Sequence, residues 1–96
     1  MLDVLIEEFI TIATYLTQHQ KSILKKGYLF VEKEFLVNLL KQNAYLTPEE
    51  KLIIWRDLGW IETDPGHLTS RLRVDGQRIR KIQIHLLVVE TLKKWR

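Results

Sequence analysis

The chain has 96 residues, 46% of them apolar, 28% charged and none cysteine. These values fit one small globular domain and exclude a disordered tail, a collagen-like fibre, a disulfide scaffold and cysteine-based metal or thiol chemistry. The net charge of +3 is uneven, because residues 1–20 hold three acidic residues and no Lys or Arg, whereas residues 66–96 hold eight basic and two acidic ones. This distribution indicates either a polyanionic partner, of which nucleic acid is the commonest, or a solvated basic surface.

The first predicted element is a long helix over residues 2–26. Apolar side chains recur at three- and four-residue steps from Leu2 to Leu16, and Gly27 offers a left-handed cap. A second apolar set on the same segment consists of Val4, Ile10, Ile12 and Tyr15. We therefore expect either a helix sunk deeply in the core or a homodimer formed through residues 2–26.

Residues 28–64 predict a strand, two helices and a second strand. The strand is expected over residues 28–31 and the first of these helices over residues 32–42, followed by a turn. Thr47 gives the clearest start signal in the chain, because Pro48 suits the first helical position and Glu50 completes a capping box. This helix is expected to end at Leu58 before Gly59, with a strand over residues 60–64 after it.

The pair Asp75–Gly76 predicts a β-hairpin, because a type I′ turn needs positive φ at both central residues. A two-residue loop pairs Leu72 with Ile79 and places these two side chains on one face of the hairpin. The opposite face then carries four arginines: Arg71, Arg73, Arg78 and Arg80. Further along the second strand, alternation places core residues on the arginine face. We expect either a bulge near Lys81 or a hairpin that projects beyond the body. A short helix is expected over residues 88–95.

This order of elements resembles a winged helix-turn-helix domain over residues 28–84. The stretch from Trp55 to Asp64, followed by the stretch from Leu72 to Arg80, is similar to C-terminal domains of helicase-like or primase-like replication proteins of phages, plasmids and other mobile elements. The resemblance implies an α+β fold with three helices, a small antiparallel sheet that includes the wing, a long N-terminal helix and a short C-terminal helix. The single domain 1–96 then consists of an N-terminal helix (1–27), the helix-turn-helix and wing (28–86) and a C-terminal segment (87–96).

Four arginines on one hairpin face repel one another, and phosphate groups would relieve that repulsion. The alternative is neutralisation by Glu62 or Asp64 on the neighbouring strand. The helix that begins at Pro48 supports DNA binding less well, because Glu49 and Glu50 at its leading end repel phosphates. The predicted nucleic-acid-binding residues are Arg71, Arg73, Arg78, Arg80, Lys81, Lys51 and Arg56.

Signals for catalysis, metals and membranes are missing from the sequence. The three histidines are far apart, the four glycines are isolated, and no metal-ligand, cofactor or nucleophile motif is present, so we expect no enzyme, cofactor or metal. No apolar run reaches the roughly 18 residues of a membrane span. Acidic residues stand where a signal peptide would be positive. We expect a soluble cytoplasmic protein without a membrane partner.

The sequence therefore predicts a DNA-binding domain of a mobile-element protein that acts in replication or transfer, with phosphate contacts mainly from the arginine-rich wing. Duplex DNA is the expected partner, and single-stranded DNA or RNA remains open because backbone contacts alone do not separate them. Two alternatives remain open. One is a protein-interaction module that docks through its first helix, and the other is a small dimeric transcriptional repressor.

Overall fold

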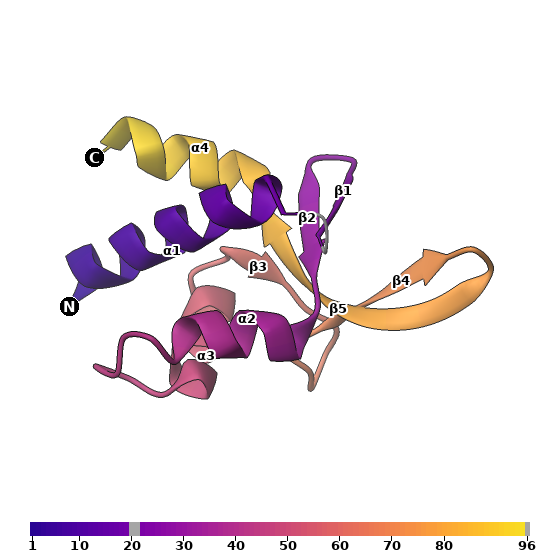
Figure 1. The fold of residues 1–96 in the computed structure, drawn as a ribbon, viewed down its shortest axis with the longest axis horizontal. Coiled ribbons are helices and arrows are strands. Elements are labelled where there is room, and N and C mark those ends of the chain that lie inside the picture. The colour runs from indigo at the N-terminus through magenta and orange to yellow at the C-terminus, as the bar shows by residue number, and fades with distance from the viewer. Residues whose placement is uncertain (20–21, 96) are drawn as a thin grey trace.

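The computed structural model describes residues 1–19 and 22–95 and has an α+β fold, which confirms the predicted class. Within these residues four helices accompany a five-stranded antiparallel sheet (Figure 1). The elements in chain order are α1 (Leu2–Thr17), β1 (Ile23–Lys25), β2 (Tyr28–Val31), α2 (Lys33–Leu40), α3 (Pro48–Asp57), β3 (Ile61–Glu62), β4 (Ser70–Val74), β5 (Gln77–His85) and α4 (Leu86–Trp95).

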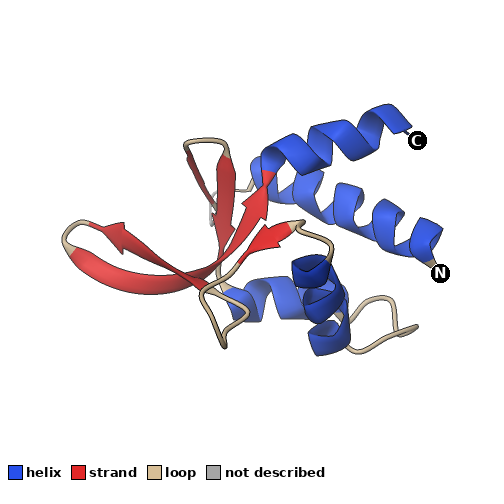
Figure 2. Cartoon of the chain, turned by 180° about the vertical axis from the view of Figure 1, so that it is seen from behind, coloured by secondary structure: helices blue, strands red, loops and turns tan. Residues whose placement is uncertain are grey.

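The sheet separates the helices from a projecting hairpin. Strands follow the order β1-β2-β5-β3, and β4 pairs only with the first half of β5. Figures 1 and 2 show the four helices gathered on one side of the sheet and the β4–β5 hairpin extending away on the other. The molecule is accordingly elongated, with extents of 40 × 26 × 24 Å. Both chain ends lie on the helical side, far from the hairpin tip (Figure 1).

The predicted helix over residues 2–26 is too long, since α1 ends at Thr17 and residues 23–25 form β1. Lys26 and Gly27 have φ angles of 52° and 83°, which make a two-residue hairpin turn between β1 and β2. Gly27 therefore takes a left-handed conformation in a strand turn instead of a helix cap. The Ser22 hydroxyl donates to the carbonyls of Leu16 and His19 beyond the helix end. Residues 20–21 of the predicted helix lie outside the described residues.

The remaining elements differ little from their predicted ranges. The capping box is confirmed, because the Glu50 amide donates to Thr47 Oγ1 at 3.1 Å and the Thr47 amide donates to Glu50 Oε1 at 3.0 Å. Helix α2 is shorter than expected by a residue or two at each end, β3 is limited to two residues, and α4 begins two residues before the expected Val88. Helix boundaries shift by this much because terminal turns fray.

The core lies between α1, the α2–α3 pair and the helical face of the sheet. Phe9 of α1 is its centre, with ring centroids 4.8 Å from Trp55 and 4.7 Å from Trp60. Burial of these large rings supplies much of the apolar area that a domain of this size needs. Sheet residues that are fully buried in the same cluster are Leu29, Val31, Ile82 and Ile84.

Helix α1 is buried on more than one face, as expected for a helix sunk in the core. Of the second apolar set, Ile10 and Ile12 are buried, whereas Val4 and Tyr15 are about half exposed. The deep-burial interpretation thus holds for the middle of the helix and leaves apolar side chains exposed towards both of its ends.

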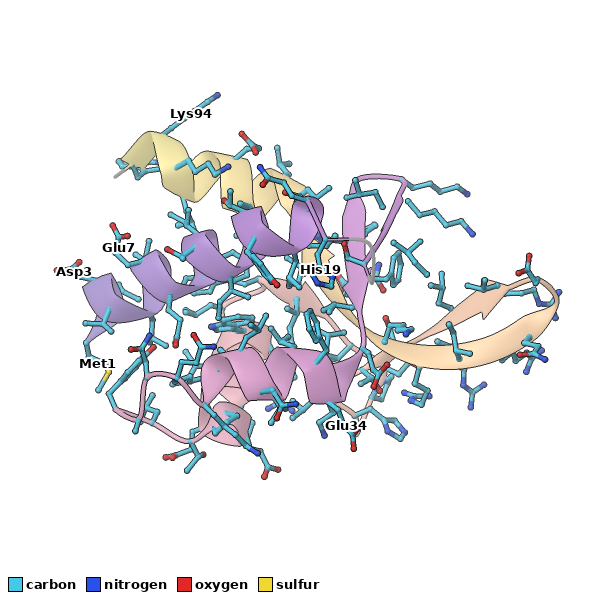
Figure 3. The ribbon with its side chains drawn as sticks, in the orientation of Figure 1. Met1, Asp3, Glu7, His19, Glu34 and Lys94 are labelled. Atoms are coloured by element: carbon cyan, nitrogen blue, oxygen red, sulfur yellow. The ribbon has the colours of Figure 1, made fainter. Side chains whose placement is uncertain are left out.

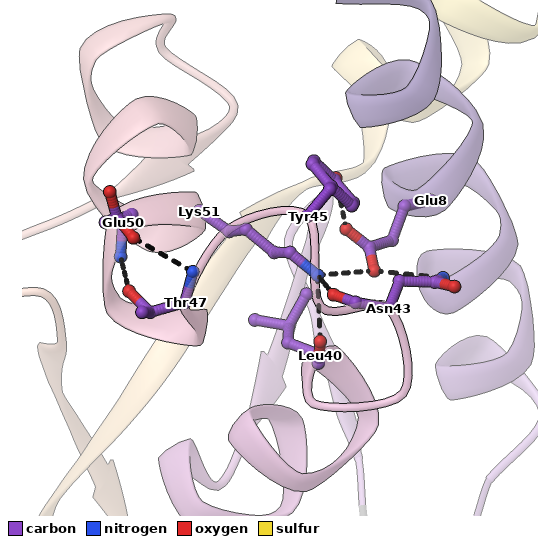
Figure 4. Close-up of polar contacts among 7 residues, drawn as sticks. All are labelled: Glu8, Leu40, Asn43, Tyr45, Thr47, Glu50 and Lys51. Atoms are coloured by element: carbon purple, nitrogen blue, oxygen red, sulfur yellow. Dashed lines mark hydrogen bonds and ion pairs between the residues drawn. The ribbon is translucent and has the colours of Figure 1, made fainter. Parts of the chain in front are cut away.

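A buried polar cluster joins α1 to the α2–α3 loop and to α3 (Figure 4). The Lys51 ammonium is fully buried and donates to Glu8 Oε2 at 2.9 Å and to the carbonyls of Leu40 and Asn43 at 2.8 and 2.5 Å. Glu8 also accepts from Tyr45 Oη at 2.5 Å and from Asn43 Nδ2 at 3.3 Å. A buried ion pair with its remaining hydrogen-bond positions occupied holds three segments in one relative position.

Tyr45 remains a donor in this cluster throughout the physiological range. Burial, together with the hydrogen bond to the Glu8 carboxylate, raises the pKa of the Tyr45 phenol well above its usual value. The Lys51 ammonium lies 4.3 Å from the centroid of the same ring, a cation–π contact. The ring therefore shields the ion pair from solvent while its hydroxyl satisfies one carboxylate oxygen.

We expect Lys51→Met to destabilise the fold by about 3–5 kcal/mol, because it leaves the Glu8 carboxylate buried without its counter-charge. The double variant with Glu8→Met should lose less than the single variant, since no buried charge remains. Urea denaturation measures both losses, and Lys41→Met, at an exposed lysine after α2, serves as the control. A single-variant loss no larger than that of the control would show that the pair does not hold the fold.

Candidate nucleic-acid interface

The β4–β5 hairpin has the turn and register that the sequence predicts. Asp75 and Gly76 have φ angles of 51° and 80°, so both central turn residues are left-handed. The strands pair Arg73 with Arg78, Leu72 with Ile79 and Arg71 with Arg80. The arginine pairs thus share one face, because residues opposite each other in an antiparallel ladder point to the same side.

The apolar face of the hairpin is the buried one. Leu72 is 6% exposed and Ile79 is half-buried, whereas Arg71, Arg73 and Arg78 are all exposed. Pairing between β4 and β5 continues without a bulge as far as Ser70 and Lys81. Strict alternation along β5 places arginines and core residues on the same face, and either a bulge near Lys81 or a projecting hairpin was expected to resolve this. The structure has the projecting hairpin, which Figure 1 shows curving away from the sheet.

Arg80, unlike the other three arginines, forms hydrogen bonds and an ion pair with neighbouring side chains. Its guanidinium donates to Asp64 Oδ2 at 3.0 Å and to Thr69 Oγ1 at 2.9 Å. Neutralisation by a neighbouring carboxylate, considered above for all four arginines, thus applies to Arg80 alone, whereas Glu62 contacts His85 at 3.2 Å. Arg80 is therefore less available to a ligand than the other three arginines, because its side chain fastens the base of the hairpin to the loop before β4.

No ion pair or side-chain hydrogen bond within residues 1–19 and 22–95 involves the guanidinium groups of Arg71, Arg73 and Arg78. These three exposed arginines are called the arginine face from here on. Lys81 is half-buried on the opposite, apolar face, across from Ser70. The hairpin therefore presents three free cations on one side and one partly shielded cation on the other.

Lys51 cannot act as a nucleic-acid contact, and its prediction as one is wrong, because the side chain is fully buried against Glu8. A signal for this burial exists in the sequence. Lys51 precedes Trp55 by four residues on α3, and Glu8 lies between Leu5 and Ile12 on the inward stripe of α1, so each charge occupies an inward position.

Helix α3 presents more negative than positive charge to solvent. Glu49, Glu50 and Asp57 are exposed, against a single exposed cation, Arg56. Arg56 donates to the Asp57 carboxylate at 3.1 Å, which further reduces its availability. The accessible positive charge of the predicted site therefore lies on the hairpin and not on the helix.

Neither metal ligands nor a matching protein family points to another site in the described part of the chain. Within the described part of the chain, no group of three or more His, Asp or Glu side chains could hold a metal ion, and no helix is long and apolar enough to cross a membrane. No protein-family model matches the sequence, and no curated protein matches it significantly. The arginine face is thus the strongest candidate site, on geometry and charge alone.

The carboxylate of Glu50 is expected to stay charged down to unusually low pH. Hydrogen bonds with the backbone and the side chain of Thr47 hold the pKa of Glu50 below its ordinary value of 4.5. A depressed pKa in the folded state gives stability that is present above pH 4.5 and is lost as the pH falls through the folded value. Glu50→Gln should therefore cost more stability at neutral pH than in acid, as measured by urea denaturation. A cost that does not change with pH would contradict this.

Proposed function

We propose that the chain is a winged-helix nucleic-acid-binding domain whose main contacts come from the arginine face of the β4–β5 hairpin. The order of elements supports the fold: α2 and α3 form the helix-turn-helix unit, and the hairpin that follows them is in the position of a wing. The strand β2, which pairs with the second half of β5, attaches this wing to the helical body.

The observation that carries the proposal is the unpaired arginine face. Arg73 and Arg78 are direct cross-strand neighbours, and Arg71 lies two residues from Arg73 on the same face. Like charges placed opposite each other weaken a sheet, so the fold gains nothing from this arrangement. Phosphate groups supply the opposite charge, and two of their oxygens can accept the two parallel N–H bonds of a planar guanidinium group.

This mode of binding is dominated by phosphate contacts and not by base readout. The exposed carboxylates of α3 would repel the backbone on both sides of a major groove, which disfavours α3 as a recognition helix. A projecting hairpin can instead follow the backbone or enter a minor groove. Duplex DNA is the preferred ligand in this proposal. Action in replication or transfer of a mobile element depends on the sequence resemblance alone.

Of the two rival functions, a sequence-specific repressor is less well supported, because it needs base contacts that the acidic surface of α3 disfavours. A protein-interaction role leaves the arginine face unexplained. Binding to duplex DNA at low salt separates these possibilities, and a salt titration then counts the phosphate contacts.

We expect Arg71→Gln, Arg73→Gln and Arg78→Gln each to weaken binding to duplex DNA and to reduce the slope of log K against log salt by about 0.9 per lost phosphate contact. Fluorescence anisotropy of a labelled duplex at several salt concentrations measures both quantities. Lys93→Gln, which removes one charge from α4 at the other end of the molecule, is the matched control and should change the slope little. If the triple arginine variant binds like the wild type, the proposed function is wrong.

Asp75→Asn should strengthen the same interaction several-fold. Asp75 is the only acidic residue between Ser70 and His85, and it lies at the hairpin tip next to the arginine face. Asparagine tolerates the positive φ of this position, so the turn is retained while the repulsion is removed. Asp57→Asn, on α3, is the control. A larger gain from Asp57→Asn than from Asp75→Asn would place the ligand on the helix instead of the hairpin.

A further inference from the structure

The face of the sheet that points away from the helices carries aromatic and basic side chains. Leu29 and Val31 of β2 are buried on the helical face, so the alternate residues of this strand point to the opposite side. Figures 1 and 2 show the four helices of the described residues gathered on the helical side alone. The uncovered side is called the open face, and its residues with rings or charges are Lys25, Tyr28, Phe30, Glu62, Lys81 and His85.

Three rings lie next to one another on the open face. The centroid of the Tyr28 ring is 4.8 Å from that of His85, its direct cross-strand neighbour, and 6.3 Å from that of Phe30. Phe30 is only 6% exposed and supports the Tyr28 ring, whereas Tyr28 and His85 are half-buried and reach solvent. His85 Nε2 lies 3.2 Å from Glu62 Oε1, a contact that orients the imidazole. An antiparallel sheet face open to water is normally polar, so this ring cluster departs from the usual pattern.

Two lysines flank this ring cluster. Lys25 of the edge strand β1 pairs with Tyr28, and Lys81 lies four residues before His85 on β5. At about 4.8 Å per strand and 3.3 Å per residue, the two lysine positions are about 10 Å apart across the sheet and about 13 Å apart along it. The rings of β2 lie between them, because β2 is the strand between β1 and β5. Neither ammonium group has an ion pair or hydrogen-bond partner among the residues that the structure describes.

Carboxylates lie outside the span of the two lysines. The acidic residue of the open face, Glu62, is on β3, on the other side of β5 from the rings of β2, and it contacts His85. Figure 3 shows Asp3, Glu7 and Glu34 on α1 and α2, on the helical side of the sheet. A polyanion that crosses the open face from β1 to β5 therefore meets two free ammonium groups.

Rings between free cations match a single-stranded nucleic acid. Its bases have uncovered π faces that stack on aromatic side chains, and its phosphates pair with basic groups along the path. A duplex fits this face poorly, because its bases already stack on one another inside the helix. An acidic peptide would pair with the lysines and leave the rings unused. The combination of rings and cations thus selects an unpaired strand.

We propose that the open face binds a single-stranded nucleic acid. Bases stack on the rings of Tyr28 and His85, and phosphate groups contact Lys25 and Lys81 on either side of them. The open face and the arginine face point in opposite directions, because successive residues of β5 alternate between the two sides of the sheet. This site shares no residue with the arginine face, so it does not rest on the proposed function, and each of the two can fail without the other.

Fluorescence anisotropy of a labelled oligothymidine of about 12 nucleotides tests the stacking, with an abasic oligomer of the same phosphate number as the matched ligand. The wild type should bind oligothymidine about fivefold or more tightly than the abasic oligomer, because one stacked base contributes at least that factor. Tyr28→Val should lose most of this preference, and Tyr28→Phe should keep it. Tyr15→Val, at a half-exposed tyrosine of α1, is the control. Equal binding of the two oligomers, or a preference that Tyr28→Val leaves intact, would overturn the proposal.

The salt dependence of binding tests the two lysines and separates them from the ring. Lys25→Gln and Lys81→Gln should each lower the slope of log K against log salt by about 0.7, the value for one phosphate of a single strand. Tyr28→Val should lower the affinity and leave the slope unchanged, since it removes no charge. Lys93→Gln on α4 is the control. Slopes that neither lysine variant changes would show that the strand lies elsewhere, and this result stands even if Tyr28→Val fails to fold.

The triple arginine variant distinguishes the open face from the arginine face. It should lose duplex binding if the proposed function is correct, and it should keep the preference for oligothymidine over the abasic oligomer in either case. A preference abolished by the arginine substitutions and unaffected by Tyr28→Val would place the unpaired strand on the arginine face and contradict the inference. An oligouridine in the same assay shows whether the open face prefers RNA or DNA.

Discussion

Side-chain alternation along β5 is the constraint on which the arrangement of this molecule depends. Ile82 and Ile84 are fully buried on the helical face of the sheet, and every second residue before them points to the same side. That rule places Arg80 and Arg78 on the core face. Because no bulge interrupts the pairing with β4, the strand cannot exchange its faces. The arginines reach solvent only because the hairpin leaves the body before their positions.

The environment along this one face changes in steps of two residues. Ile82 is in the core, Arg80 is held by Asp64 and Thr69, and Arg78 is exposed and unpaired among the described residues. Arg80 thus marks the boundary between the part of β5 that stabilises the fold and the part available to a ligand. A guanidinium suits this position because its long apolar stem packs near the core while its charged end reaches a surface carboxylate.

The parts of the fold and site that the sequence predicts are those set by neighbouring residues. The Asp75–Gly76 turn fixes the register of the arginines, and the Thr47 capping box fixes the start of α3. The Lys26–Gly27 turn was not predictable in the same way, since lysine rarely has positive φ and a glycine after a helical pattern equally suits a cap. The sequence places Lys51 and Glu8 at inward helical positions but does not pair them, because they are 43 residues apart. Only the packed structure brings these two charges together.

The elongated shape of the molecule places the arginine face at one end, away from the helices. Three free arginines on one hairpin can neutralise only a few phosphates, and affinity from so few contacts falls steeply as salt rises. The buried Glu8–Lys51 pair fixes α1 to the α2–α3 unit from which the hairpin continues, so the hairpin is attached to one rigid helical body.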